Sequence, residues 1–300
     1  MSTILIAGGS GLIGQKLTTL LLEKGHQVRW LTRAVTKKEP VPSFRWDPAL
    51  GQMDSGALDQ CDAIVSLAGT PIASGKWTAA FKDEVIGSRL QAARTLIKAL
   101  DEYPHQVKCL VSASAIGYYG NRGDEWLNEN SDPGSGFLAE TTLKWEKAYA
   151  TSPVRSVKLR IGIVLSNNGG ALKELLQPLQ FGICPILGDG RQFMSWIHIE
   201  DVCRMIMHSI ENESSEGVFN AVAPSPVRQA EFMQLLRKIF QRGSIAIPAP
   251  SFMMKMILGE KSAIVLDSTR VSCRKMQESG FDFLYPTLQS ALQQLHAQQT

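Results

Sequence analysis

The spacing of apolar residues changes along the first half of the chain, and each change predicts a new element. An apolar run over 3–7 ends in glycines, and apolar residues at helical spacing follow over 12–21. Gly25 ends this helix, and 26–32 indicates a second strand. Further strands are expected at 44–46, 62–68, 107–114 and 157–165, and helices at 76–100 and 137–150. Strands that alternate with helices predict an α/β fold, a doubly wound parallel sheet with right-handed crossovers.

The pattern loosens after residue 165, where helical segments outnumber strands. Helices are expected at 171–180, 200–210, 227–240, 252–258 and 286–296, and short strands at 196–199 and 217–220. Glycine and proline mark 182–190 as turn-rich and 248–250 as a break.

Composition narrows the class of protein. The chain has 300 residues, of which 44% are hydrophobic and 20% charged, as in soluble globular proteins. The net charge is only +3 and the basic residues form no stripe, so nucleic acid is not an expected partner. No apolar run is long enough to cross a membrane, and the N-terminus lacks the basic start of a signal peptide. The five cysteines form no CxxC pair, which predicts buried thiols in a reducing, cytoplasmic compartment and no metal site.

The glycines after the first strand are spaced G-x-x-G-x-x-G and open a helix. Gly8 suits a tight turn, Gly11 a close approach of the backbone to a ligand, and Gly14 close packing of helix on strand. A helix N-terminus directs unpaired N–H groups and a positive dipole end at an anion such as a dinucleotide pyrophosphate. The alternative is an ordinary tight turn, but the complete strand–turn–helix–strand unit favours dinucleotide binding. The expected cofactor-binding residues here are Gly8, Ser10, Gly11, Leu12, Ile13 and Gly14.

The residues at the end of the second strand indicate which nicotinamide cofactor binds. A ribose 2′-hydroxyl requires an acidic acceptor, whereas a 2′-phosphate requires a cation. Arg33 follows this strand, Lys37 and Lys38 come soon after, and Glu39 is the first acid. The sequence therefore predicts NADP(H), with a solvated loop charge as the alternative role of Arg33. Because ligands bind beyond the carboxyl ends of parallel strands, Leu67, Ala68 and Gly69 are expected at the same edge.

Six motifs occur along nearly the whole chain: Gly8–Gly14, Leu67–Gly69, Ser112–Ser114, Tyr118–Gly120, Leu159–Arg160 and Trp196–Asp201. In their residues and their order they resemble the motifs of extended short-chain dehydrogenases/reductases, the NAD-dependent epimerase/dehydratase group. The chain also resembles an atypical epimerase-like branch through Trp77, Ser88-Arg89, Phe137-Leu138, Trp145-Glu146, Ser195–His198, Gly280–Phe283, Tyr285-Pro286 and Ala291-Leu292.

This resemblance implies a Rossmann domain with a smaller, mostly helical C-terminal substrate domain. The Rossmann domain is expected over 1–165, with 191–222 returning to it. The substrate domain is expected over 166–190 and 223–300.

The chain departs from the superfamily where catalysis is expected. Members use a Tyr and a Lys, spaced Y-x-x-x-K, and a carboxylate commonly follows the Lys by four residues. Anchoring on Glu146 puts Leu138 in the Tyr position and Thr142 in the Lys position, and neither side chain can do that work at neutral pH. Ser114, or Ser112, occupies the place of the superfamily Ser and can bond a carbonyl or a hydroxyl.

Two tyrosines offer a replacement acid. Tyr118 and Tyr119 directly follow the strand that carries Ser114, so a phenol is the candidate catalytic acid. The alternative is packing within the loop, because no partner that would lower a phenol pKa is evident.

The candidate substrate contacts are Glu146, Arg160, Arg191 and Trp196. Sugar-nucleotide members often carry Arg-Asp, with the Arg on the diphosphate, where this chain has Met194 and Ser195, which counts against a nucleotide-sugar substrate. We therefore expect an NADP(H)-binding oxidoreductase or epimerase-like enzyme for a small polar substrate, monomeric or homodimeric. A catalytically inactive NADPH-binding sensor is the alternative, motivated by the missing Tyr–Lys pair.

Overall fold

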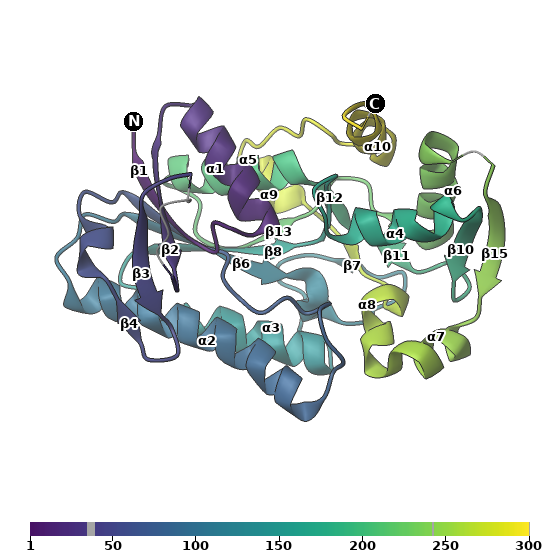
Figure 1. Cartoon of the computed structure of the whole chain (residues 1–300), viewed down its shortest axis with the longest axis horizontal. Helices are drawn as coiled ribbons and strands as arrows, with labels where there is room; N and C mark the ends of the chain where they lie inside the picture. The colour runs from purple at the N-terminus through teal and green to yellow at the C-terminus, as the bar shows by residue number, and fades with distance from the viewer. Residues whose placement is uncertain (35–39, 242, 300) are drawn as a thin grey trace. The chain divides into compact units, whose positions relative to one another are not determined.

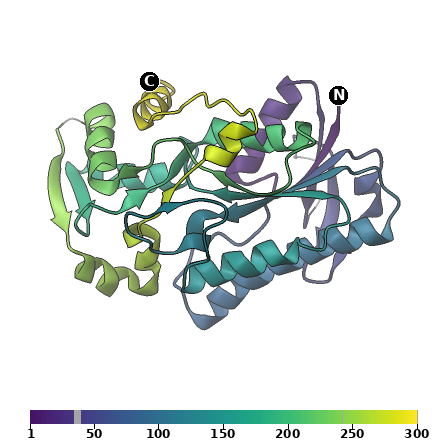
Figure 2. The ribbon, with the colours of Figure 1, turned by 180° about the vertical axis from the view of Figure 1, so that it is seen from behind.

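The computed structural model describes residues 1–34, 40–241 and 243–299, and the chain divides into two compact units. The first unit contains Met1–Ala115, Glu140–Arg160 and Cys203–Phe219. The second contains Ile116–Ala139, Ile161–Val202 and Asn220–Thr300. Figures 1 and 2 show the chain from opposite sides. The predicted division at residue 165 stays a prediction.

An eight-stranded sheet forms the first unit, in the order β13-β8-β6-β5-β1-β2-β3-β4. Its strands are β1 (Thr3–Ala7), β2 (Gln27–Thr32), β3 (Ser43–Asp47), β4 (Gln52–Met53), β5 (Ala63–Ser66), β6 (Cys109–Ala115), β8 (Arg155–Ile161) and β13 (Gly217–Ala221). The strands β3, β2, β1, β5 and β6 run parallel, and β4 is antiparallel to β3. This is the strand order of the Rossmann fold, with its switch point between β1 and β5, and it confirms the predicted fold class.

Helices cover both faces of this sheet. α2 (Ala79–Glu102) and α3 (Phe137–Ala148) lie along one face, and α1 (Leu12–Glu23) and α5 (Ile199–Glu211) along the other. The side chain of Thr78 accepts a hydrogen bond from Phe81 N, so α2 begins at residue 79 rather than at the predicted residue 76.

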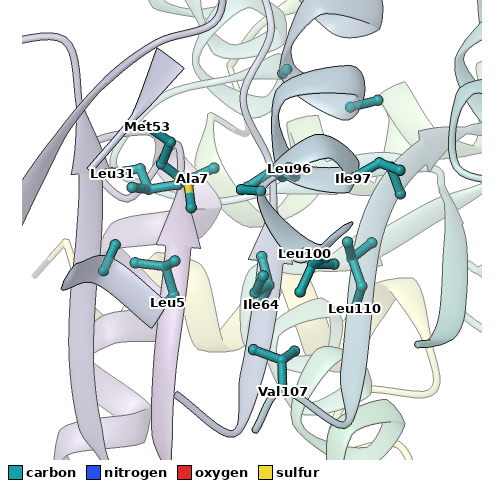
Figure 3. Packing of buried hydrophobic residues seen from close by; sticks show 14 of the residues in the cluster. Leu5, Ala7, Leu31, Met53, Ile64, Leu96, Ile97, Leu100, Val107 and Leu110 are labelled. Atoms are coloured by element: carbon teal, nitrogen blue, oxygen red, sulfur yellow. The ribbon is translucent and has the colours of Figure 1, made fainter. Parts of the chain in front are cut away.

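The core of the first unit lies between the sheet and α2. Side chains alternate across a strand, so one face receives Leu5 and Ala7 from β1 with Ile64 and Leu110 from the neighbouring strands. Figure 3 shows Leu96, Ile97 and Leu100 of α2 packed against these side chains. This buried face holds the strands in position, so their carboxyl ends lie together at the edge where a ligand would bind.

The second unit is built of helices and paired short strands. Its strand pairs are β7 (Trp126–Leu127) with β16 (Arg270–Val271), β9 (Ile163–Leu165) with β12 (Trp196–His198), β10 (Ile183–Leu187) with β15 (Ile245–Ala249), and β11 (Phe193–Met194) with β14 (Val227–Arg228). Its helices are α4 (Ala171–Gln180), α6 (Gln229–Phe240), α7 (Ser251–Leu258), α8 (Ala263–Leu266), α9 (Arg274–Glu278) and α10 (Leu288–Ala297). The unit also holds the 3-10 turn η2 (Ile116–Tyr119).

The core of the second unit forms around Trp196, Phe232 and Leu292. The pair of β10 and β15 corrects the sequence analysis, which expected only turns and a break there. Both strands are apolar throughout and each contains a proline, so they show no alternation of apolar and polar residues.

The cysteine thiols, the helix lengths and the residue types that bind metals are all defined in the described parts of the chain. The five cysteines are all buried free thiols, and burial raises the pKa of Cys61 and Cys109 to about 11. In the ranges that the structure describes, no helix has the length and apolar character of a membrane span. Within the same ranges, no His, Cys, Asp and Glu side chains gather as metal ligands would.

Candidate functional site

The glycine turn between β1 and α1 is packed tightly against neighbouring backbone. Gly8 has a φ of +89°, and a Cβ there would lie 2.9 Å from the backbone N of Ala68. A Cβ at Gly14 would collide with the carbonyl oxygen of Gly8 and with Gly9. Glycine is therefore required at both positions, which brings the first turn of α1 against the end of β1.

The N-terminus of α1 is left open to a ligand. Gly11 is its N-cap, no side chain in the described chain caps it, and its first turn holds no acid. Ser10 and Gly11 are exposed, and Leu12 and Ile13 are half-buried. The first N–H groups of a helix have no partner within the helix, so the turn retains donors and a positive dipole end. These features fit the pyrophosphate of a dinucleotide.

The other residues expected at the cofactor lie at the same edge of the sheet. Arg33 is exposed and follows β2, and Leu67, Ala68 and Gly69 follow β5. Because β2, β1 and β5 are parallel neighbours, their carboxyl ends meet here. Lys37 and Lys38 lie outside the described residues.

A buried ionic cluster lies at the end of β6. Ser114 donates a hydrogen bond of 2.5 Å to Oε1 of Glu146 on α3. Arg160 on β8 grips the same carboxylate, with Nε 2.8 Å from Oε1 and Nη2 2.9 Å from Oε2. Arg160 and Glu146 are 3% and 9% exposed, so the pair is withdrawn from solvent. Of the four candidate substrate contacts, Glu146 and Arg160 thus bind one another.

This cluster fixes the hydrogen-bonding role of Ser114. A carboxylate held by both arms of a guanidinium only accepts hydrogen bonds, so the Ser114 proton points at Glu146. The lone pairs of Ser114 Oγ remain, and they can accept a hydrogen bond from a ligand hydroxyl or amine. The sequence allowed either a carbonyl or a hydroxyl, and the cluster favours the hydroxyl. The alternative serine, Ser112, is buried and its hydroxyl has no partner among the described residues.

The hydroxyl and lysine groups closest in sequence to the superfamily dyad lie elsewhere. Tyr149 is 1% exposed and donates to Ser66 Oγ at 2.7 Å, and burial raises its pKa to about 12. Lys144 lies two residues past Thr142, about 200° further around α3, and it is exposed. Thr142, in the superfamily Lys position, is buried.

Lys158 is a charged residue that the sequence analysis missed. It lies on β8 two residues before Arg160, which puts both side chains on one face of the strand. Burial lowers its pKa, and the nearby Glu146 and Glu216 oppose that shift. A lysine within an apolar strand gives no sequence signal for such a neighbour, because Glu146 comes from a different element.

The candidate tyrosines lie in η2 of the second unit. Tyr119 is fully buried, and its hydroxyl donates to Asn220 Oδ1 at 2.7 Å. The amide of Asn220 in turn donates to the Ser272 carbonyl, so Tyr119 is part of a polar anchor in this unit. The Tyr118 ring meets the Tyr119 ring edge-on, with centroids 5.3 Å apart. These contacts favour packing, the alternative role, and the acid role of either tyrosine stays a prediction.

The two remaining candidate substrate residues also lie in the second unit. Trp196 is fully buried, and its indole N–H donates to the Ser225 carbonyl at 3.0 Å. Arg191 is exposed, and its backbone N–H donates to Asp189. Their contact with substrate stays a prediction.

Family comparisons agree with this architecture. A model of the NAD dependent epimerase/dehydratase family matches residues 4–221. A second model, described as a domain of unknown function (DUF1731), matches residues 249–295. The chain therefore belongs to the NAD dependent epimerase/dehydratase family.

Several relatives match over almost their whole length. Human epimerase family protein SDR39U1 is 35% identical over 98% of this chain and 99% of its own. The chloroplastic SDR39U1 homolog of Arabidopsis thaliana is 35% identical over 97% of this chain and 85% of its own. The crystal structure of human SDR39U1 (isoform2) with NADPH superposes with a TM-score of 0.89, at 33% identity, covering 98% of this chain and 99% of that one. Since one relative is chloroplastic, the compartment of this chain stays a prediction.

Proposed function

We propose that this protein binds NADP(H) at the carboxyl edge of its first-unit sheet and acts as an oxidoreductase or epimerase-like enzyme on a small polar substrate. The observation that carries the proposal is the uncapped N-terminus of α1, held against β1 by Gly8 and Gly14. The NADPH in the human SDR39U1 structure supports the choice of cofactor.

Residues of this chain have separate tasks in the proposed complex. The turn from Gly8 to Gly14 would hold the pyrophosphate through backbone N–H groups, and Arg33 would bind the 2′-phosphate. Leu67, Ala68 and Gly69 would line the same edge. When bound, NADP(H) supplies hydride transfer.

Ser114 is the proposed substrate-positioning residue. Its proton is committed to Glu146, so Ser114 Oγ would accept a hydrogen bond from a substrate hydroxyl or amine. Arg160 holds Glu146 by two hydrogen bonds, which keeps Ser114 in one orientation. Tyr118 and Tyr119 remain the candidate acids.

A second candidate function is NADPH binding without turnover. It is favoured by Leu138 and Thr142 in the places of the superfamily Tyr and Lys. The buried Tyr149, with its pKa of about 12, is a poor replacement for the dyad.

Calorimetry on the wild type and on Arg33→Ala tests the cofactor. We expect Arg33→Ala to weaken NADPH binding by about 10- to 100-fold, because it removes a charge-assisted contact with the 2′-phosphate. NADH binding should stay unchanged, since NADH carries no 2′-phosphate. Arg94→Ala, which removes an exposed arginine from α2, is the matched control. Equal NADPH affinity in Arg33→Ala and wild type would contradict the assignment.

Turnover separates the two candidate functions. Cofactor absorbance is followed while protein and NADPH, or NADP⁺, meet a panel of small carbonyl compounds and polyhydric alcohols. Turnover that Ser114→Ala abolishes, with NADPH affinity kept, supports the enzyme. Tight NADPH binding, with no change in cofactor absorbance and no change in the configuration of any compound, favours the second candidate.

A further inference from the structure

Arg89 on α2 points its guanidinium at the loop after β5. Its Nη1 donates to the carbonyl oxygens of Thr70 and Val85, at 3.0 and 2.9 Å. Both bonds use the same nitrogen. The edge of the guanidinium formed by Nε and Nη2 therefore keeps its donors, which is the edge that grips a phosphate or carboxylate in a two-point contact.

The guanidinium packs against both an indole ring and a glycine. Its Cζ is 4.9 Å from the ring centroid of Trp145 on α3, a cation–π distance. A Cβ at Gly69 would lie 3.2 Å from both Cγ and Cζ of Arg89, so the side chain also packs closely against the loop at Gly69. This packing fixes the plane of the guanidinium before any ligand binds.

No acid within the described ranges forms an ion pair with Arg89. Its neighbours are used differently, because Glu146 binds Arg160 and Glu84 accepts from the Thr70 hydroxyl. Burial lowers the pKa of Arg89 to about 10, and no acidic neighbour opposes the shift. In contrast, the buried Arg160 of the same unit is paired with the carboxylate of Glu146. A partly buried cation without an anion is unfavourable, and a bound anion would relieve it.

The position of Arg89 connects it to the glycine turn. Gly69 continues the loop whose Leu67 and Ala68 backbone contacts Gly8. This loop follows β5, and β5 and β1 flank the switch point of the sheet, where ligands bind in α/β folds.

We propose that Arg89, with Trp145 and the Gly69–Thr70 backbone, forms an anion-binding subsite for a phosphate or carboxylate group of a ligand at this edge. The inference rests on the proposed function only in placing a ligand there. The anionic group belongs either to the NADP(H) pyrophosphate or to an acidic substrate, and the two sources respond differently in the test below.

The test compares Arg89→Gln with Arg94→Gln, which makes the same charge change at an exposed position of α2. Melting temperatures are measured with sodium phosphate or malonate against sodium chloride of equal ionic strength. We expect both anions to raise the melting temperature of wild type and Arg94→Gln by clearly more than that of Arg89→Gln. A response of Arg89→Gln equal to that of wild type overturns the proposal.

NADPH calorimetry on the same variants identifies the source. An NADPH affinity about 10-fold lower in Arg89→Gln than in Arg94→Gln assigns the anion to the cofactor. The anion is assigned to the substrate if Arg89→Gln keeps the NADPH affinity of Arg94→Gln. In that case the response to phosphate or malonate should still be reduced in Arg89→Gln when NADPH is saturating. Failure of wild type to bind NADPH would refute the proposed function alone, since the phosphate and malonate responses do not depend on it.

Arg89→Lys keeps the proposal testable if Arg89→Gln does not fold. Lysine retains the charge but not the planar fork, so we expect a weaker phosphate response than that of wild type. A phosphate response as large as that of wild type would overturn the two-point contact.

Discussion

The glycine turn and the Ser114 cluster lie in the same unit but are specified in different ways. The turn is contiguous in sequence, and its geometry follows from the absence of Cβ atoms at Gly8 and Gly14. The cluster joins Ser114 to Glu146 across 32 residues, and Glu146 to Arg160 across 14. A site that binds its ligand through backbone groups can therefore be predicted from consecutive residues. A buried network of side chains can be identified only when the fold is known.

Gly14→Val should have the largest effect on the turn. The added side chain would collide with the Gly8 carbonyl and Gly9, and relief requires α1 to move away from β1. We expect the free energy of unfolding to fall by about 3 kcal/mol or more, measured by urea denaturation. NADPH binding should be lost even where the variant folds. Stability and affinity equal to those of wild type would show that α1 does not depend on this contact.

Glu146→Gln should have the next largest effect on stability, and it tests the side-chain network of Ser114, Glu146 and Arg160. The change leaves the Arg160 guanidinium, 3% exposed, without its counter-charge. We expect a loss of about 3 kcal/mol in urea denaturation. The double variant Glu146→Gln/Arg160→Met should recover most of it, because the unpaired Arg160 charge is removed. Equal losses in the single and double variants would contradict a role for the unpaired charge.

The buried phenol of Tyr149 predicts a loss of stability at high pH. Its folded-state pKa, about 12, lies above its ordinary value of 10, so its contribution is complete below pH 10 and is lost as pH rises through 12. Two pKa units correspond to about 3 kcal/mol. Unfolding of wild type and Tyr149→Phe is measured between pH 8 and 12, and the slope above pH 10 should be shallower in the variant. Identical slopes would contradict the assignment, since the buried thiols are common to both proteins.

Gly87→Ala should produce the smallest effect and serves as the matched control for Gly14→Val. Gly87 lies within α2, and a Cβ there meets no atom within 4 Å. Alanine in a helix interior should stabilise the protein by about 0.5–1 kcal/mol, observed as a higher urea midpoint, with NADPH affinity unchanged. A destabilised Gly87→Ala would mean that glycine at this position has a packing role.

The difference between the glycine turn and the Ser114 cluster extends to the rest of the molecule, where most continuous apolar runs were predictable from the sequence and distant contacts were not. The strands β1, β5 and β6 were predictable, because each is a mainly apolar run followed by turn residues, and β2 because Val28 and Trp30 alternate with polar residues. The order of motifs predicted the family, and the turn predicted the place of a cofactor. Arg89 was visible only as a motif residue on a helix, since its contact with Trp145 depends on the packing of α2 beside α3. The neighbours of Lys158 could not be predicted, because Glu146 and Glu216 come from other parts of the chain. The pair of β10 and β15 could not be predicted because both strands are apolar throughout and contain a proline.

Titration of the wild-type protein with NADPH and with NADH, by calorimetry at one salt concentration, tests the central claim most directly. The account predicts NADPH binding with a stoichiometry of one site per chain, and an NADPH affinity at least about 10-fold higher than that for NADH. Equal affinity for the two nucleotides would contradict the role of Arg33. The absence of binding by either nucleotide would contradict the whole assignment of the glycine turn.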